Sequence, residues 1–257
     1  MTRIICVSSG KGGVGKTTVA SNLGMALNEF GMNTLLIDAN ITTPHLGFHL
    51  GVPLYPKTLH DVLRGEVEIN DAIFIHPSGL KVMPGSISIS DLKSTSPEKL
   101  AEVVLELIGK HDYIFLDGAA GLGKEPLAGM EASDELLIVT NPQLPAVTDA
   151  LKVIKLGEEY GSHILGVVLN RVSGRKSELT VDDVESLLGY PVIAKIPEDK
   201  NVDDAIAAKL PIVAYMPNSP AAIELKKLAA KLAGIEWRPP ENKTGGFFSR
   251  IFGFLRK

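Results

Sequence analysis

The chain has 257 residues, of which 45% are hydrophobic, 22% charged and 5% aromatic. This length can bury one large hydrophobic core or two small ones, and the composition is typical of an α/β protein. The formal net charge is −4. A general nucleic-acid surface needs a basic face, so nucleic acid is not an expected partner.

The first strand-like run, residues 3–7, contains Cys6, the chain's single cysteine. One cysteine cannot form an internal disulfide, which indicates a buried thiol in a reducing compartment. Met1 runs directly into this strand and leaves no room for a signal peptide, and the chain has no apolar run of eighteen residues. We therefore expect a cytoplasmic protein without a membrane span.

A glycine-rich segment, residues 10–18 with the sequence GKGGVGKTT, follows this strand and precedes a helix expected over 18–29. It fits the phosphate-loop pattern G-x-x-x-x-G-K-[ST]. Its glycines let backbone N–H groups approach phosphate oxygens, Lys16 would reach the β- and γ-phosphates, and Thr17 would ligate Mg²⁺. The residues expected to contact the nucleotide here are Gly12, Gly13, Val14, Gly15, Lys16, Thr17 and Thr18.

Apolar runs alternate with helical patterns along the rest of the chain. Strands are expected at 34–37, 80–83, 113–116, 135–140, 164–169 and 192–196, and helices at 97–107, 146–160, 181–188 and 220–233. Continuous hydrophobicity within a strand indicates that both its faces are covered. The prediction is one α/β domain over 1–234, a doubly wound, mostly parallel sheet with helices on both faces. Such a sheet binds ligands at the carboxyl ends of its strands.

Two aspartates end strands of this predicted sheet. Asp38 follows the run 34–37 and Asp117 follows 113–116, so both would lie in the crevice that holds the hydrated metal ion. The metal set would be Thr17, Asp38 and Asp117. Residues 118–121 are interpreted as a flexible sensor of the γ-phosphate. Without the phosphate loop, a strand-ending aspartate that caps a turn would be the better interpretation of Asp117.

Lys11 gives the loop the form K-G-G-x-G-K-T, which resembles the deviant Walker-A loop of the MinD/ParA ATPases. Further matches to the MinD branch, including Gly121 after Asp117 and the segment 140–142, extend this resemblance over nearly the whole chain. The resemblance implies ATP or ADP with Mg²⁺ as cofactors. It also implies an ATP-bound homodimer in which Lys11 contacts the partner's phosphates, as an arginine finger does.

The same resemblance assigns the base site. Asn170 matches an asparagine that reads adenine and is followed by Arg171, and Asn170 offers both a donor and an acceptor. The segment 196–199 matches a loop that covers the adenine mostly through its backbone. The residues implied for the base side are Asn170, Arg171, Pro197, Glu198 and Asp199.

One position departs from the family pattern. The family usually has D-x-D after the second strand, whereas this chain has Asp38, Ala39 and Asn40. The second aspartate of the family positions the attacking water, and Asn40 can accept a hydrogen bond but cannot take a proton. Phosphoryl transfer depends mainly on positioning and charge, so slow hydrolysis is expected; a scaffold that barely hydrolyses ATP is the alternative. The catalytic set would be Lys11, Lys16, Asp38, Asn40 and Asp117.

The C-terminal segment differs from the body in charge. The net charge is −4 overall and +4 in the last fifteen residues, which leaves −8 for the rest. Residues 235–244 contain prolines and are expected to form a flexible linker, and 245–257 an amphipathic helix that lies on an anionic membrane. A helix packed on the core or on a partner is the alternative. The membrane-contacting residues would be Phe247, Phe248, Arg250, Ile251, Phe252, Phe254, Leu255, Arg256 and Lys257.

These features together predict a dimerising ATPase of the MinD type that binds the inner face of the membrane peripherally. It would position the division apparatus or another polar structure, with a regulatory protein partner that the residues do not identify. A ParA-like DNA-segregation ATPase is the alternative, but it would need a basic folded body, and this body is acidic.

Overall fold

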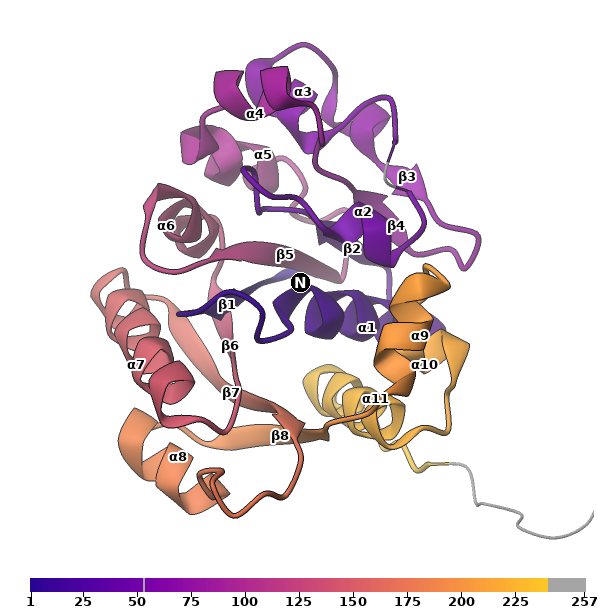
Figure 1. Ribbon diagram of the computed structural model, residues 1–257. Coiled ribbons are helices and arrows are strands. Elements are labelled where there is room, and N and C mark those ends of the chain that lie inside the picture. The colour runs from indigo at the N-terminus through magenta and orange to yellow at the C-terminus, as the bar shows by residue number, and fades with distance from the viewer. Residues whose placement is uncertain (53, 240–257) are drawn as a thin grey trace, which may run out of the picture.

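An eight-stranded sheet runs through the middle of the molecule in the computed structural model, which describes residues 1–52 and 54–239 (Figure 1). The strand order is β3-β4-β2-β5-β1-β6-β7-β8, and every neighbouring pair is parallel except β3 with β4. The strands are β1 (Arg3–Ser9), β2 (Thr34–Ile37), β3 (Phe74–Ile75), β4 (Lys81–Met83), β5 (Tyr113–Ala120), β6 (Glu135–Thr140), β7 (His163–Val172) and β8 (Val192–Pro197). The prediction of a doubly wound, mostly parallel sheet is confirmed.

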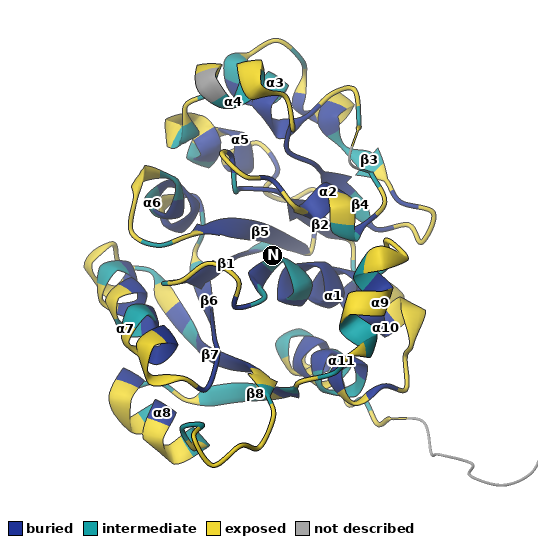
Figure 2. Cartoon of the chain, viewed as in Figure 1, coloured by how far each residue is buried: buried dark blue, intermediate teal, exposed yellow. Residues whose placement is uncertain are grey.

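Helices cover both faces of this sheet. One face packs against α3 (Leu59–Arg64), α5 (Leu100–Leu105), α6 (Lys124–Glu131), α7 (Leu144–Glu159) and α8 (Val181–Leu188). The other packs against α1 (Lys16–Glu29), α2 (Leu46–His49), α9 (Asn201–Ala207), α10 (Ile212–Tyr215) and α11 (Pro220–Ala233). The central strands are buried, whereas the outer helices expose the sides that face away from the sheet (Figure 2).

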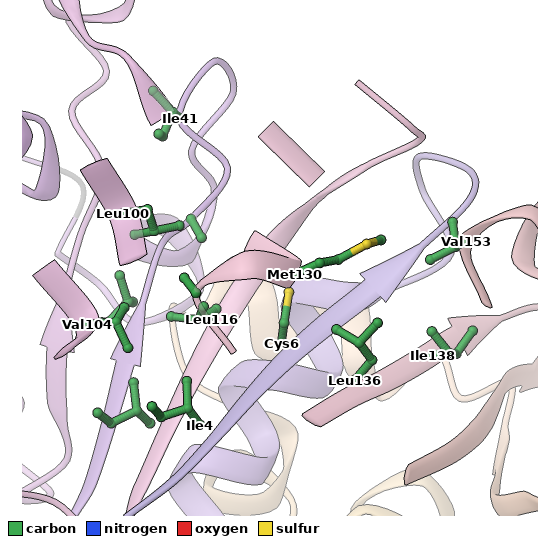
Figure 3. Packing of buried hydrophobic residues seen from close by; sticks show 14 of the residues in the cluster. Ile4, Cys6, Ile41, Leu100, Val104, Leu116, Met130, Leu136, Ile138 and Val153 are labelled. Carbon is green, nitrogen blue, oxygen red and sulfur yellow. The ribbon is translucent and has the colours of Figure 1, made fainter. Parts of the chain in front are cut away.

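The sheet has a hydrophobic core on each face, and β1 contributes side chains to both cores. Ile4 and Cys6 belong to the first core, and Ile5 and Val7 belong to the second, because successive side chains of a strand point to opposite faces. Figure 3 shows Cys6 in the first core together with Met130 of α6. The thiol of Cys6 is fully buried, as predicted.

Several expected boundaries differ from the observed ones. The helix expected over 97–107 is a short 3₁₀ helix, Pro97–Lys99, followed by α5. Residues 118–120 form the end of β5, where Ala120 lies opposite Ser9 of β1, so most of the segment interpreted as a flexible sensor is strand. Gly118 permits this close pairing, since a Cβ there would lie 2.9 Å from the carbonyl oxygen of Val7.

The C-terminal half of the linker and the whole predicted amphipathic helix, residues 240–257, lie outside the described residues. The described part ends five residues after Gly234, whose left-handed φ of 67° ends α11 as predicted. Within the described residues, no helix combines the length and the apolar character needed to cross a membrane.

Candidate functional site

The loop between β1 and α1 curls around the N-terminus of α1, close to the centre of the molecule (Figure 1). Gly13 and Gly15 have φ values of 79° and 100°, in the left-handed region that glycine adopts without strain. Gly15 precedes α1 and has no side chain to cap it, so the first backbone N–H groups of the helix remain available to phosphate oxygens. The predicted phosphate loop therefore has the backbone geometry that an anion site requires.

Lys16 is buried at this N-terminus, and its ammonium group donates a hydrogen bond to the hydroxyl of Ser9 at 3.0 Å. The Ser9 hydroxyl in turn donates to the carbonyl oxygen of Lys11 at 2.8 Å. Burial lowers the pKa of Lys16, and the charge of Asp117 opposes this shift. A buried cation of this kind is stabilised by an anionic ligand, which matches the predicted role of Lys16 toward phosphate.

Asp38 and Asp117 form a buried acidic pair behind the loop. Asp38 accepts a hydrogen bond from the backbone N–H of Leu46 at 2.9 Å, and burial together with Asp117 raises its pKa well above the usual value. Burial raises the pKa of Asp117 to about 6. The side chain of Thr17 lies close to Asp117 and acts to lower its pKa. Even so, neither carboxylate oxygen of Asp117 has a hydrogen-bond partner among the described residues.

These orphaned oxygens fit a divalent cation. Carboxylates and hydroxyls are the ligands that Mg²⁺ prefers, and a cation would offset the repulsion between Asp38 and Asp117. The described residues contain no cluster of three His, Cys, Asp or Glu side chains able to hold a metal by themselves. Phosphate oxygens and water would therefore complete the coordination, as is usual for Mg²⁺.

A cleft of about 630 Å³ opens above this pair. The predicted residues that line it are Gly12, Gly13, Gly15, Lys16, Thr17, Thr18, Asn40 and Arg171. Asp38 and Asp117 are too deeply buried to reach its surface, and Val14 is buried beneath the loop. Lys11 is exposed and is not among the described residues that line the cleft.

A second cavity of about 330 Å³ adjoins the first, since both are lined by Thr18 and Arg171. All five residues predicted for the base side line it: Asn170, Arg171, Pro197, Glu198 and Asp199. Arg171 has a φ of 56°, a strained value for a residue other than glycine, at the junction of the two cavities. The phosphate and base predictions thus converge on two adjoining cavities.

Two of these base-side residues have structural roles that the sequence does not reveal. The Asn170 side-chain amide donates to the carbonyl oxygen of Val14 at 2.8 Å, so one of its two N–H donors braces the phosphate loop, and its second N–H and its oxygen remain for a base. The Asp199 carboxylate accepts hydrogen bonds from the N–H groups of Asn201 at 3.0 Å and Ala221 at 3.3 Å. Asp199 therefore ties the wall of the base cavity to the start of α11.

Asn170→Ala is expected to lower the free energy of unfolding by about 1–3 kcal/mol, because it removes a buried hydrogen bond to the carbonyl of Val14. The looser loop should also bind ADP more weakly. Urea unfolding with and without ADP measures both effects, and Asn218→Ala, at an exposed asparagine, is the matched control. Equal unfolding free energies for Asn170→Ala and Asn218→Ala would contradict the bracing role.

The cleft also contains residues that sequence reasoning missed, above all Thr42 and Glu125. Thr42 lies in the loop after β2, and Glu125 is the second residue of α6. Nothing in the sequence distinguishes Glu125 from an ordinary acidic residue in a first helical turn. His45 and His49 also line the cleft, and burial lowers the pKa of His49 to about 4.

Comparison with known proteins agrees with this geometry. A family model described as ParA, NUBPL iron-transfer P-loop NTPase, matches residues 1–233. An uncharacterized ATP-binding protein of Methanocaldococcus jannaschii is 38% identical over 258 residues, covering 98% of this chain and 98% of that protein. The septum site-determining protein MinD of Pyrococcus horikoshii, solved with Mg-ADP, has a TM-score of 0.88 at 37% identity and covers 90% of this chain and 96% of that one.

A chain of the solved MinC:MinD cell division protein complex of Aquifex aeolicus has a TM-score of 0.82 at 32% identity, covering 93% of this chain and 99% of that one. The iron-transfer description of the family model finds no counterpart here, because a fully buried Cys6 is the only thiol and an iron–sulfur cluster needs several. The family match over residues 1–233 includes the phosphate loop and all eight described strands. The chain therefore belongs to the ParA/MinD family of P-loop NTPases.

Proposed function

We propose that the protein is a MinD-type ATPase, a switch that binds Mg²⁺-ATP, dimerises in that state and associates with the membrane until ATP is hydrolysed. One observation carries the proposal: at the phosphate loop, Lys16 is buried at the N-terminus of α1, and the nearby carboxylate of Asp117 has no hydrogen-bond partner among the described residues. This arrangement leaves one positive and one negative group to be satisfied by phosphate and by a metal ion. The Mg-ADP complex of the Pyrococcus horikoshii relative supports the same ligand.

The residues of this chain would share the work on ATP. The loop backbone and Lys16 would bind the phosphates, while Thr17, Asp38 and Asp117 would hold the metal ion directly or through water. Mg²⁺ in that position offsets charge on the phosphate oxygens. Asn40 lines the cleft, and its side-chain oxygen accepts a hydrogen bond from the Thr43 hydroxyl at 3.1 Å. Because its side chain is an amide, Asn40 can orient water but cannot remove a proton from it. Slow turnover is the expected consequence.

Dimerisation would complete this site. Lys11 is exposed beside the cleft and is available to a second copy of the chain, whose phosphates it would contact in the closed dimer. A cation supplied in this way stabilises charge that develops during transfer, so hydrolysis would depend on the dimer. The MinC:MinD complex supports a regulatory protein as a further partner.

The ATP-bound dimer would bind at the inner face of the cytoplasmic membrane. The ATPase domain would span 1–234, the linker 235–244, and residues 245–257 would form an amphipathic helix on anionic lipid. A single helix of this length binds lipid weakly, whereas two helices on one dimer bind together through their effective concentration. Nucleotide state would in this way determine where the protein is, and hence where the division apparatus or another polar structure forms.

Light-scattering measurement of the mass of the full chain tests the switch. We expect a dimer with Mg²⁺-ATP, a monomer with Mg²⁺-ADP or without nucleotide, and slow phosphate release that rises with protein concentration. The same mass under all three conditions would refute the proposal.

A further inference from the structure

At the rim of the phosphate cleft, one pair of residues ties the loop after β2 to the first turn of α6. The backbone N–H of Thr42 donates to Oε2 of Glu125 at 3.2 Å, and the Thr42 hydroxyl donates to Oε1 of the same carboxylate. Thr42 belongs to the loop that follows β2, and Glu125 to the first turn of α6, which follows β5. Both oxygens of Glu125 are therefore engaged by a residue 83 positions away.

The loop held by this contact carries Asn40. The N–H of Asn40 donates to Oδ1 of Asp38 at 3.4 Å, and the Thr43 hydroxyl donates to Oδ1 of Asn40. The side chains of Thr42 and Thr43 are exposed, whereas Ile41 and Pro44 on either side of them are buried. Apolar packing therefore holds the flanks of this stretch, and hydrogen bonds are left to hold the two exposed threonines between them. The inner side of the loop is anchored to Asp38, and the contact with Glu125 anchors its outer side.

Glu125 is also the only carboxylate among the described residues that line the cleft. A bare carboxylate at that place would repel the phosphates of a nucleotide. Both oxygens of Glu125 accept hydrogen bonds from Thr42, so the negative charge has a local partner and the carboxylate is held toward the loop. The contact thus explains how an acidic side chain is accommodated in a cleft built for anions.

We propose that Glu125 is a positioning residue, which clamps Thr42 and thereby holds Asn40 over the phosphate cleft. The clamp joins the loop after Asp38 to the helix that follows Asp117, so the two carboxylate-bearing segments move together. The inference rests on the proposed function in one respect, namely that this cleft binds ATP. Glu125 acts on the reaction through Thr42 and Asn40 rather than by contact with phosphate.

Exchange of the fluorescent nucleotide mant-ATP, together with phosphate release at saturating ATP, tests the clamp. Glu125→Ala is expected to release mant-ATP about tenfold faster and to lower kcat more than it raises KM, since hydrogen bonds to a charged group are lost. Glu125→Gln keeps one acceptor for Thr42 and should lie between wild type and Glu125→Ala. Glu131→Ala, at an exposed glutamate of the same helix, should behave as wild type.

A double-mutant cycle with Thr42→Val separates a clamp from an independent role of Glu125. Because the partner hydroxyl is already absent, Glu125→Ala should accelerate release by only about threefold in the Thr42→Val background. An equal effect of Glu125→Ala in both backgrounds, or unchanged exchange and kcat in Glu125→Ala, would overturn the clamp. Failure of the wild-type chain to bind mant-ATP would instead overturn the proposed function, and the clamp with it.

Discussion

Asp117→Asn is expected to raise the free energy of unfolding of the nucleotide-free protein at pH 8 by about 1–3 kcal/mol while removing its response to Mg²⁺. Burial raises the pKa of Asp117 to about 6, above its ordinary value of 3.8. Between about pH 4 and pH 6, Asp117 is therefore protonated in the folded chain and ionised in the unfolded chain. The stability contributed by this group is present below pH 4 and is lost as the pH rises through 6.

Urea unfolding in EDTA, at pH 5 and at pH 8, measures this effect. The gain of Asp117→Asn over wild type should be larger at pH 8, where the wild-type carboxylate is ionised without a hydrogen-bond partner among the described residues. Addition of Mg²⁺-ATP should stabilise wild type but not the variant, because an amide is a poor substitute for a metal-binding carboxylate. Asp134→Asn, at an exposed position, is the control. Equal gains at both pH values, or full stabilisation of Asp117→Asn by Mg²⁺-ATP, would contradict the assignment.

Lys11→Ala is expected to abolish the ATP-dependent dimer and to lower kcat by about 10³-fold, while the affinity for ATP changes by less than about twofold. The side chain is exposed and does not line the cleft of its own chain. The loop interacts with Lys11 through its carbonyl oxygen, which accepts from Ser9 and is retained in alanine. The loss should therefore concern the partner's site and leave the chain's own site intact.

Mant-ATP titration and light scattering of Lys11→Ala test this separation, with Lys176→Ala as the exposed-lysine control. Loss of nucleotide binding would place Lys11 in the site of its own chain. Dimer formation equal to wild type would show that the lysine has no role between chains.

Local sequence patterns predict the helices whose ends are marked by capping residues. The helix expected at 181–188 matches α8, where Thr180 and Asp183 form a capping box. The helix expected at 220–233 matches α11, which begins after the N-cap Ser219 and ends at Gly234. Helices α2 and α10, with four residues each, are too short to show a hydrophobic period and were not predicted.

The candidate site also has one part that the sequence predicts and another part that it does not. The phosphate loop is contiguous in sequence and could be read from its glycines and Lys16. The brace from Asn170 to Val14 joins residues 156 positions apart, and the clamp from Glu125 to Thr42 joins residues 83 apart. Such contacts depend on the order of strands in the sheet, which no local pattern specifies. Residues 118–120 were misread as a loop for the same reason, because their pairing with β1 is a tertiary contact.

Cosedimentation with vesicles of phosphatidylglycerol and phosphatidylcholine tests the central claim, that nucleotide state controls membrane association. The full chain should pellet with vesicles in Mg²⁺-ATP and remain in the supernatant with Mg²⁺-ADP or without nucleotide. Lys11→Ala, and a chain ending at residue 239, should stay in the supernatant even with ATP. Equal sedimentation of the full chain in all three nucleotide conditions would contradict the account.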